Sequence, residues 1–70
     1  MKIYYDDHSD LLYIRFEERK QELENKRVTE DIVLDIGDGG KIVGIEILDA
    51  SRHINLENVL PTHYEIPKAS

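Results

Sequence analysis

The sequence predicts an α+β fold, a four-stranded antiparallel β-meander with a short C-terminal helix packed on one face. Apolar residues alternate with polar ones in four segments, which is the pattern of half-buried strands. A glycine-rich turn separates the last two segments, and apolar residues at helical spacing follow them. Seventy residues form a single domain. We expect a core over about 2–60 and a partly flexible tail over 61–70.

The first two predicted strands flank a cluster of turn-forming residues. Lys2–Tyr5 and Leu11–Phe16 alternate in the manner of strands. Asp6–Asp10 lies between them, and the side chains of such residues bond to their own backbone, so this segment predicts a hairpin turn. Residues 17–26 are almost wholly charged or amide, with Leu23 the single apolar residue. They predict a solvated connection or a ragged edge strand.

The third and fourth predicted strands are Ile32–Ile36 and Lys41–Leu48, with an irregularity expected at 29–31. Gly37–Gly40 predicts a tight turn between them, because glycine tolerates the positive φ angles that such turns require. Within the fourth strand, Gly44 leaves room for a close neighbour.

A short helix is expected near Asp49–Leu60. Asp49 or Ser51 is suited to cap its first turn, and Asn55 a second turn. Pro61 ends it.

Both faces of the predicted sheet carry apolar residues. The face expected beneath the helix holds Ile3, Tyr5, Leu12, Ile14, Phe16, Ile32, Leu34, Ile36, Val43, Ile45 and Ile47. The second face offers Tyr4, Leu11, Tyr13, Val33, Ile42 and Leu48. A short helix cannot cover both faces, and an uncovered apolar patch indicates a partner surface. We therefore expect a homodimer or a protein partner on the second face, with Arg15 and Glu46 pairing across the sheet to set the register.

Charge and composition limit the partners. Fifteen acidic and nine basic residues give a net charge of −6, which disfavours direct nucleic-acid binding and favours a basic protein partner. The sequence has no cysteine, no signal-peptide pattern and no apolar run of membrane-spanning length. The expected location is the cytoplasm, without membrane attachment.

The order of several short motifs resembles a family of short prokaryotic proteins, domain of unknown function family 2283. The matching residues run from Tyr4-Tyr5-Asp6 through Asp10–Arg15 and Val33-Leu34-Asp35 to Gly39–Ser51. The most specific part is Gly44–Ser51. The resemblance implies a small α+β protein with no established activity, catalytic residues or cofactor, and it suggests an antitoxin-like companion of a small basic protein.

Two groups of polar residues are candidates for metal binding or acid–base chemistry. Asp6, Asp7, His8 and Asp10 are possible ligands of a divalent cation, so a small metal-binding or metal-dependent protein using this loop is the alternative function. The loop lacks the spacing, the central glycine and the terminal glutamate of an EF-hand. Glu46 with Asp49 offers paired carboxylates, but no catalytic constellation is recognised. We therefore predict a non-enzymatic protein that needs no cofactor.

Overall fold

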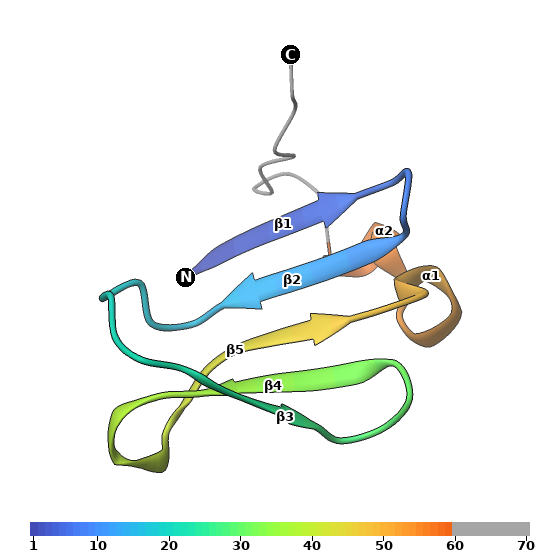
Figure 1. The fold of residues 1–70 in the computed structure, drawn as a ribbon. Coiled ribbons are helices and arrows are strands. Elements are labelled where there is room, and N and C mark those ends of the chain that lie inside the picture. The colour runs from blue at the N-terminus through green and yellow to red at the C-terminus, as the bar shows by residue number, and fades with distance from the viewer. Residues whose placement is uncertain (60–70) are drawn as a thin grey trace.

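The computed structural model describes residues 1–59. They form one antiparallel sheet in the order β1-β2-β5-β4-β3, followed by two helical turns (Figure 1). The strands are β1 (Lys2–Asp6), β2 (Leu11–Arg15), β3 (Glu24–Arg27), β4 (Ile32–Ile36) and β5 (Ile42–Ile47). The helices are α1 (Ala50–His53) and α2 (Leu56–Val59), and a 3₁₀ turn, η1, spans Asp38–Gly40. The tail predicted over 61–70 lies outside the described residues.

The predicted antiparallel sheet is confirmed, but its strand number and order were wrong. The four predicted strands form, and Glu24–Arg27 adds a fifth at the edge of the sheet. This agrees with the edge strand predicted as one of two alternatives for the charged segment 17–26. The sheet is not a simple meander, because β5 lies between β2 and β4. The register pairs Leu12 with Ile47 and Ile14 with Ile45, so the apolar residues of β2 and of the central strand β5 lie side by side.

Two turns and one bulge shape this sheet. Gly39 and Gly40 have φ angles of 72° and 75°, which confirms the glycine turn before β5. The irregularity expected at 29–31 is instead the turn between β3 and β4, closed by hydrogen bonds between Thr29 and Ile32. The register shift lies elsewhere, between Asp35 and Ile36, where β4 meets β5.

The predicted helix is two separate turns of four residues each, α1 and α2. Asn55 confirms its predicted capping role, since its side-chain oxygen accepts the backbone N–H of Glu57 at 3.1 Å. The turns pack over a core of Leu12, Ile47 and Ala50 through Ile54 and Leu56. None of the helices in residues 1–59 is long and apolar enough to cross a membrane.

Candidate interaction surface

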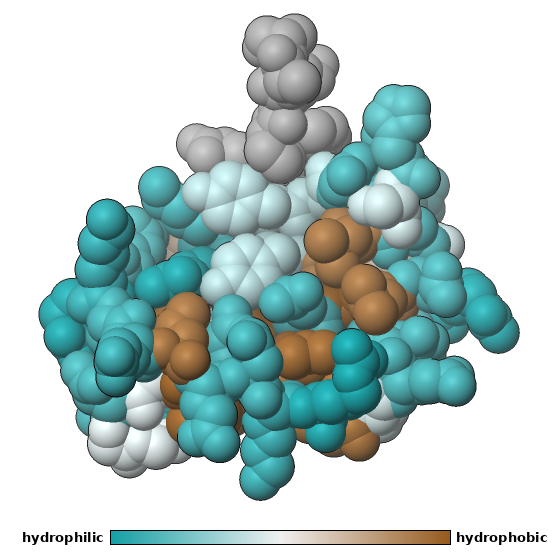
Figure 2. Space-filling view, in the orientation of Figure 1, coloured by the Kyte–Doolittle hydropathy of each residue, from teal (hydrophilic) through white to brown (hydrophobic). Residues whose placement is uncertain are grey.

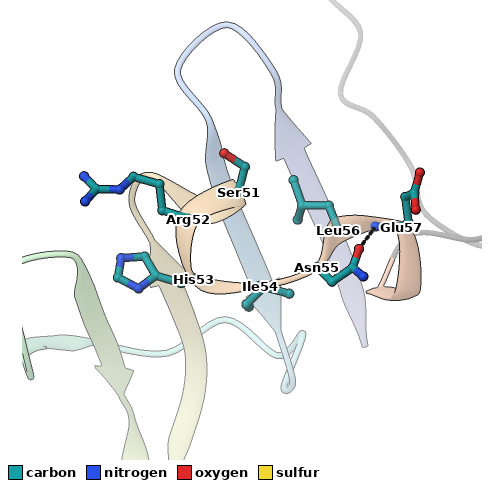
Figure 3. A pocket seen from close by; sticks show the side chains of 7 residues that line it. All are labelled: Ser51, Arg52, His53, Ile54, Asn55, Leu56 and Glu57. Carbon is teal, nitrogen blue, oxygen red and sulfur yellow. Dashed lines mark hydrogen bonds between the residues drawn. The ribbon is translucent and has the colours of Figure 1, made fainter.

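The helical turns cover only one end of their face of the sheet. Leu12 and Ile47 pair across β2 and β5 at this end and are 0% and 5% exposed. The segment with α1 and α2 crosses the strands here (Figure 3). One row further along, Ile14, Ile45 and Leu34 pair across three strands and are only half-buried. Beyond the Leu12 row these three side chains are therefore partly exposed, although Val43, further along β5, is only 2% exposed.

The bulge adds a residue to the uncovered end. It pairs Ile42 with Ile36, which by alternation lies on the helix-bearing face with Leu34. Ile42 is 50% exposed, and it lines a hollow together with Phe16, which is 49% exposed. Sequence alternation had assigned Ile42 to the second face. We define the uncovered strip as the apolar residues of this face that lie beyond the helices of residues 1–59: Ile14, Phe16, Leu34, Ile36, Ile42 and Ile45.

The opposite face is organised around a buried carboxylate. Asp35 on β4 is 4% exposed and accepts two side-chain hydrogen bonds. The Tyr13 hydroxyl donates to one oxygen at 3.0 Å, and the Asn25 amide donates to the other at 2.6 Å. These bonds link β2, β4 and β3. The polar network therefore joins strands that are not all neighbours in the sheet.

The Tyr13 hydroxyl reaches Asp35 by crossing β5 over Gly44. A Cβ built on Gly44 would lie 2.6 Å from that hydroxyl oxygen, so the expectation of a close neighbour at this glycine is confirmed. Burial raises the pKa of Tyr13, the bond with Asp35 raises it further, and Arg15 opposes the shift. The Tyr13 ring stacks on Tyr4 of the edge strand, with centroids 6.5 Å apart and planes inclined by 23°.

The residues predicted to form a partner surface differ in exposure. On this opposite face Val33 is buried, and Tyr4, Leu11, Tyr13, Arg15 and Glu46 are half-buried. Leu48 follows β5 and is also half-buried, while Ile42 belongs to the uncovered strip. Figure 2 shows the face opposite the helical turns, where small separate groups of hydrophobic side chains lie among hydrophilic ones. The two strip residues Phe16 and Ile42 are more exposed than any of the other residues predicted on the opposite face.

The predicted ion pair between Arg15 and Glu46 does not form. In the register Arg15 lies opposite Gly44, and Glu46 lies opposite Tyr13 and Val33. The Arg15 guanidinium donates instead to the carbonyl oxygens of Glu17 at 2.6 Å and Arg19 at 3.4 Å. Backbone carbonyls of the loop after β2 therefore replace the carboxylate as its partners.

Two carboxylates of the acidic loop before β2, those of Asp6 and Asp10, accept internal hydrogen bonds. Asp6 accepts the His8 backbone N–H and the Ser9 hydroxyl, both at 3.0 Å, and these bonds lower its pKa. Asp10 accepts the Tyr5 hydroxyl at 2.7 Å and the Ser51 hydroxyl at 2.6 Å. Within residues 1–59, no group of three or more histidine or acidic side chains is placed to hold a metal ion. The loop is thus built as a turn with two capping carboxylates.

A further hollow of about 540 Å³ lies along residues 51–57 (Figure 3). Its walls come from α1, α2 and their connection. His53 extends from this segment toward the sheet, and its Nε2 lies 2.9 Å from a carboxylate oxygen of Asp31. That contact ties α1 to the turn before β4, so its role is structural.

Sequence reasoning missed the partial exposure of the helix-bearing face and the buried Asp35 network. The tyrosine and asparagine that bind Asp35 are 22 and 10 residues away from it. The alternation of Ile-Val-Leu-Asp-Ile did show that Asp35 shares a face with Val33, and that was the available signal.

Comparison with known proteins gives one match. The family described as "Protein of unknown function (DUF2283)" matches residues 2–51, which include all five strands and the start of α1. No curated protein and no solved structure matches the chain significantly. The matched region covers most of the 70-residue chain and confirms the resemblance seen in the sequence, so the chain belongs to the DUF2283 family.

Proposed function

We propose that this protein is a protein-interaction module that associates with a second copy of itself through the uncovered strip. The observation that carries the proposal is the exposure of apolar side chains on the helix-bearing face, where Phe16 and Ile42 are about half exposed. Beyond the row at Leu12 and Ile47, apolar side chains continue across three strands, and Ile14 and Ile45 are only partly buried against the core. A contiguous apolar area on a small domain is typical of an interface.

The strip is suited to be the centre of a modest interface. Stable interfaces remove about 800 Å² from each partner, and the whole chain exposes 5248 Å². The strip would supply the apolar centre of such an interface, and the polar residues around it would supply the rest of the area. Stacked sheets lie about 10 Å apart, a separation that isoleucine, leucine and phenylalanine side chains fill.

The polar edge of the strip favours a copy of the same chain. Lys26 pairs in register with Leu34, and Glu24 pairs with Ile36, so the edge strand brings one charge of each sign beside the strip. A two-fold axis places the same patch on both partners, so that the lysine of one copy can face the glutamate of the other. This self-complementary edge supports a homodimer.

The proposal is tested by measuring self-association in solution. The wild-type mass is measured by light scattering across a dilution series, beside the separate variants Phe16→Asp and Ile42→Asp. Both positions are half-exposed, so the variants keep their fold, which circular dichroism verifies. Val28→Asp is the matched control, because Val28 is 54% exposed and lies outside the strip.

The expected result is a dimer that both strip variants convert to monomer and that the control leaves intact. A monomer at all concentrations would contradict the proposal. Binding of that monomer to a small basic protein through the strip would favour the antitoxin-like alternative over the homodimer. The acidic net charge of the chain would then contribute to the attraction between the two proteins. A dimer lost only in Leu11→Asp would move the interface to the opposite face.

A further inference from the structure

A hollow of about 310 Å³ lies on the opposite face, at the edge where β1 begins and β2 ends. Figure 1 shows these two strand ends side by side. The walls of this hollow are Lys2, Tyr4, Tyr13, Arg15, Glu18 and Lys20. We refer to it as the tyrosine pocket. It faces away from the uncovered strip, so the proposed dimer leaves it open.

Positive charge gathers in the tyrosine pocket although the chain is acidic. Three of the nine lysines and arginines line it, in a protein of net charge −6. Its one acid, Glu18, is paired with the N-terminal ammonium group at 3.1 Å, and this partner lowers the pKa of Glu18. Neither Lys2 nor Lys20 forms a salt bridge within residues 1–59. Local attraction for an anion therefore remains.

The aromatic wall of the pocket is held in place. Tyr13 is fixed by the bond from its hydroxyl to buried Asp35, and Tyr4 stacks beside it on the edge strand. Arg15 is oriented by the carbonyl oxygens of Glu17 and Arg19. Fixed side chains lose little entropy when a ligand binds. Aromatic rings on a sheet surface, next to cations, are a common platform for stacking a nucleic-acid base.

We propose that the tyrosine pocket binds a nucleoside phosphate, with the base stacked on the tyrosine pair and the phosphate held by Lys2, Arg15 and Lys20. A tyrosine ring supplies a π-face for the base, and the cations supply donors for phosphate oxygens. The volume is at the lower end of the range of small-molecule sites. A single nucleotide suits this hollow better than a long strand, because the surrounding acidic surface repels further phosphates.

The test is a titration of the ¹⁵N-labelled full chain with adenosine 5′-monophosphate, followed by amide chemical shifts. We expect saturable shifts concentrated at Lys2, Tyr4, Tyr13 and Arg15. Adenosine alone and inorganic phosphate alone are expected to bind at least about tenfold more weakly, because each lacks one half of the recognition. Equal binding of phosphate alone would overturn the role of the base.

Variants separate this site from general electrostatics. Lys2→Glu and Lys20→Glu should each weaken binding about tenfold or more, and Tyr4→Leu by a similar factor through loss of stacking. Lys41→Glu is the control with the same charge change at a position outside the pocket. Equal weakening by the control, or the absence of saturable shifts at millimolar nucleotide, would overturn the proposal. So would affinity for single-stranded oligonucleotides that rises steeply with their length, which would indicate a strand-binding surface.

The dimer proposal and the nucleotide-binding proposal can be contradicted independently of each other. Phe16→Asp tests dimer formation and leaves the pocket residues unchanged, whereas Tyr4→Leu tests nucleotide binding and leaves the strip unchanged.

Discussion

The carboxylate of Asp10 caps α1 from a position 41 residues earlier in the chain, by accepting the backbone N–H and the hydroxyl of Ser51. The hydroxyl bond is 2.6 Å long, and the N–H bonds to the two carboxylate oxygens are 3.1 and 3.2 Å. The Asp10 carbonyl also accepts the N–H of Ala50 at 2.8 Å. Asp49, the formal N-cap residue, makes no side-chain capping bond. The first hairpin thus positions the helical turns over the sheet.

The first prediction concerns this cap. Asp10→Asn should lower the melting temperature by roughly 4–8 °C, because it removes the charged acceptor of three donors: the Ser51 N–H, the Ser51 hydroxyl and the Tyr5 hydroxyl. Hydrogen bonds from Ser51 and then Tyr5 lower the pKa of Asp10. A lowered folded-state pKa gives stability that is present above the unfolded value of about 3.9 and is lost as pH falls through the folded value. The variant should therefore show a weaker loss of stability in acid.

Thermal melts between neutral and acid pH measure this effect. Asp7→Asn is the control in the same loop, since no hydrogen bond to the Asp7 side chain is found within residues 1–59. A melting temperature that falls equally in both variants would contradict the capping role.

The second prediction concerns Tyr5 at alkaline pH. Its hydrogen bond to Asp10, followed by burial and the nearby acidic charges, raises the pKa of Tyr5 to about 12. The neutral phenol is therefore favoured by folding, and the stability it contributes below pH 10 is lost as pH rises toward 12. Tyr5→Phe should abolish the highest step in a tyrosinate absorbance titration. An unchanged titration curve would show that the assignment to Tyr5 is wrong.

The third prediction concerns the crossing of Tyr13 over Gly44. Tyr13→Phe leaves Asp35 with one side-chain donor and should reduce the free energy of unfolding by about 1.5–3 kcal/mol, the usual value for a hydrogen bond to a charged group. Gly44→Ala should also destabilise, since its Cβ meets the Tyr13 hydroxyl at 2.6 Å. In the double variant the added methyl group has more room. Denaturant unfolding should therefore show that Gly44→Ala is less harmful when Tyr13 is phenylalanine.

The fourth prediction uses salt to separate two kinds of partner. Two copies of net charge −6 repel each other, so the proposed homodimer should become tighter as salt screens that repulsion. A complex with a basic protein should weaken under the same change. Sedimentation measured at low and high salt gives the direction. A homodimer that weakens strongly with salt would point to ion pairs, rather than the apolar strip, as its main contact.

The fifth prediction concerns the metal-binding alternative. Calcium, magnesium, manganese and zinc at millimolar concentration should leave the melting temperature unchanged, because Asp6 and Asp10 already accept internal donors. A cation that binds only the folded state must raise its stability by mass action. A clear rise that is lost in Asp6→Asn would establish the alternative function.

The sequence predicts most strands of this fold because their side chains alternate. Ile32–Ile36 and the Gly37–Gly40 turn are examples in which local pattern and backbone preference agree. Alternation does not predict β3, because its sequence Glu-Asn-Lys-Arg contains no apolar residue. It forms as an edge strand, where backbone pairing with β4 and the bond from Asn25 to Asp35 replace burial.

The order of the strands in the sheet is harder to predict than the position of each strand in the sequence. Alternation shows which residues share a face but not which strand lies beside β2. Nor does it reveal the bulge that brings Ile42 to the helix-bearing face, because one extra residue reverses the alternation beyond it. The proposed interface therefore lies on the uncovered strip and not on the second face, where it was predicted. Most residues of the strip were predicted to belong to the core.

The place of β5 between β2 and β4 also determines how the chain reaches its fold. The hairpin of β1 and β2 finds its sheet neighbour only in residues 42–47, roughly thirty positions after β2. During synthesis the edge of β2 stays unpaired until β5 has left the ribosome. The β1–β2 hairpin can then pair with β5, which also pairs with β4. The complete sheet should therefore form late, slowly and cooperatively for a domain of this length.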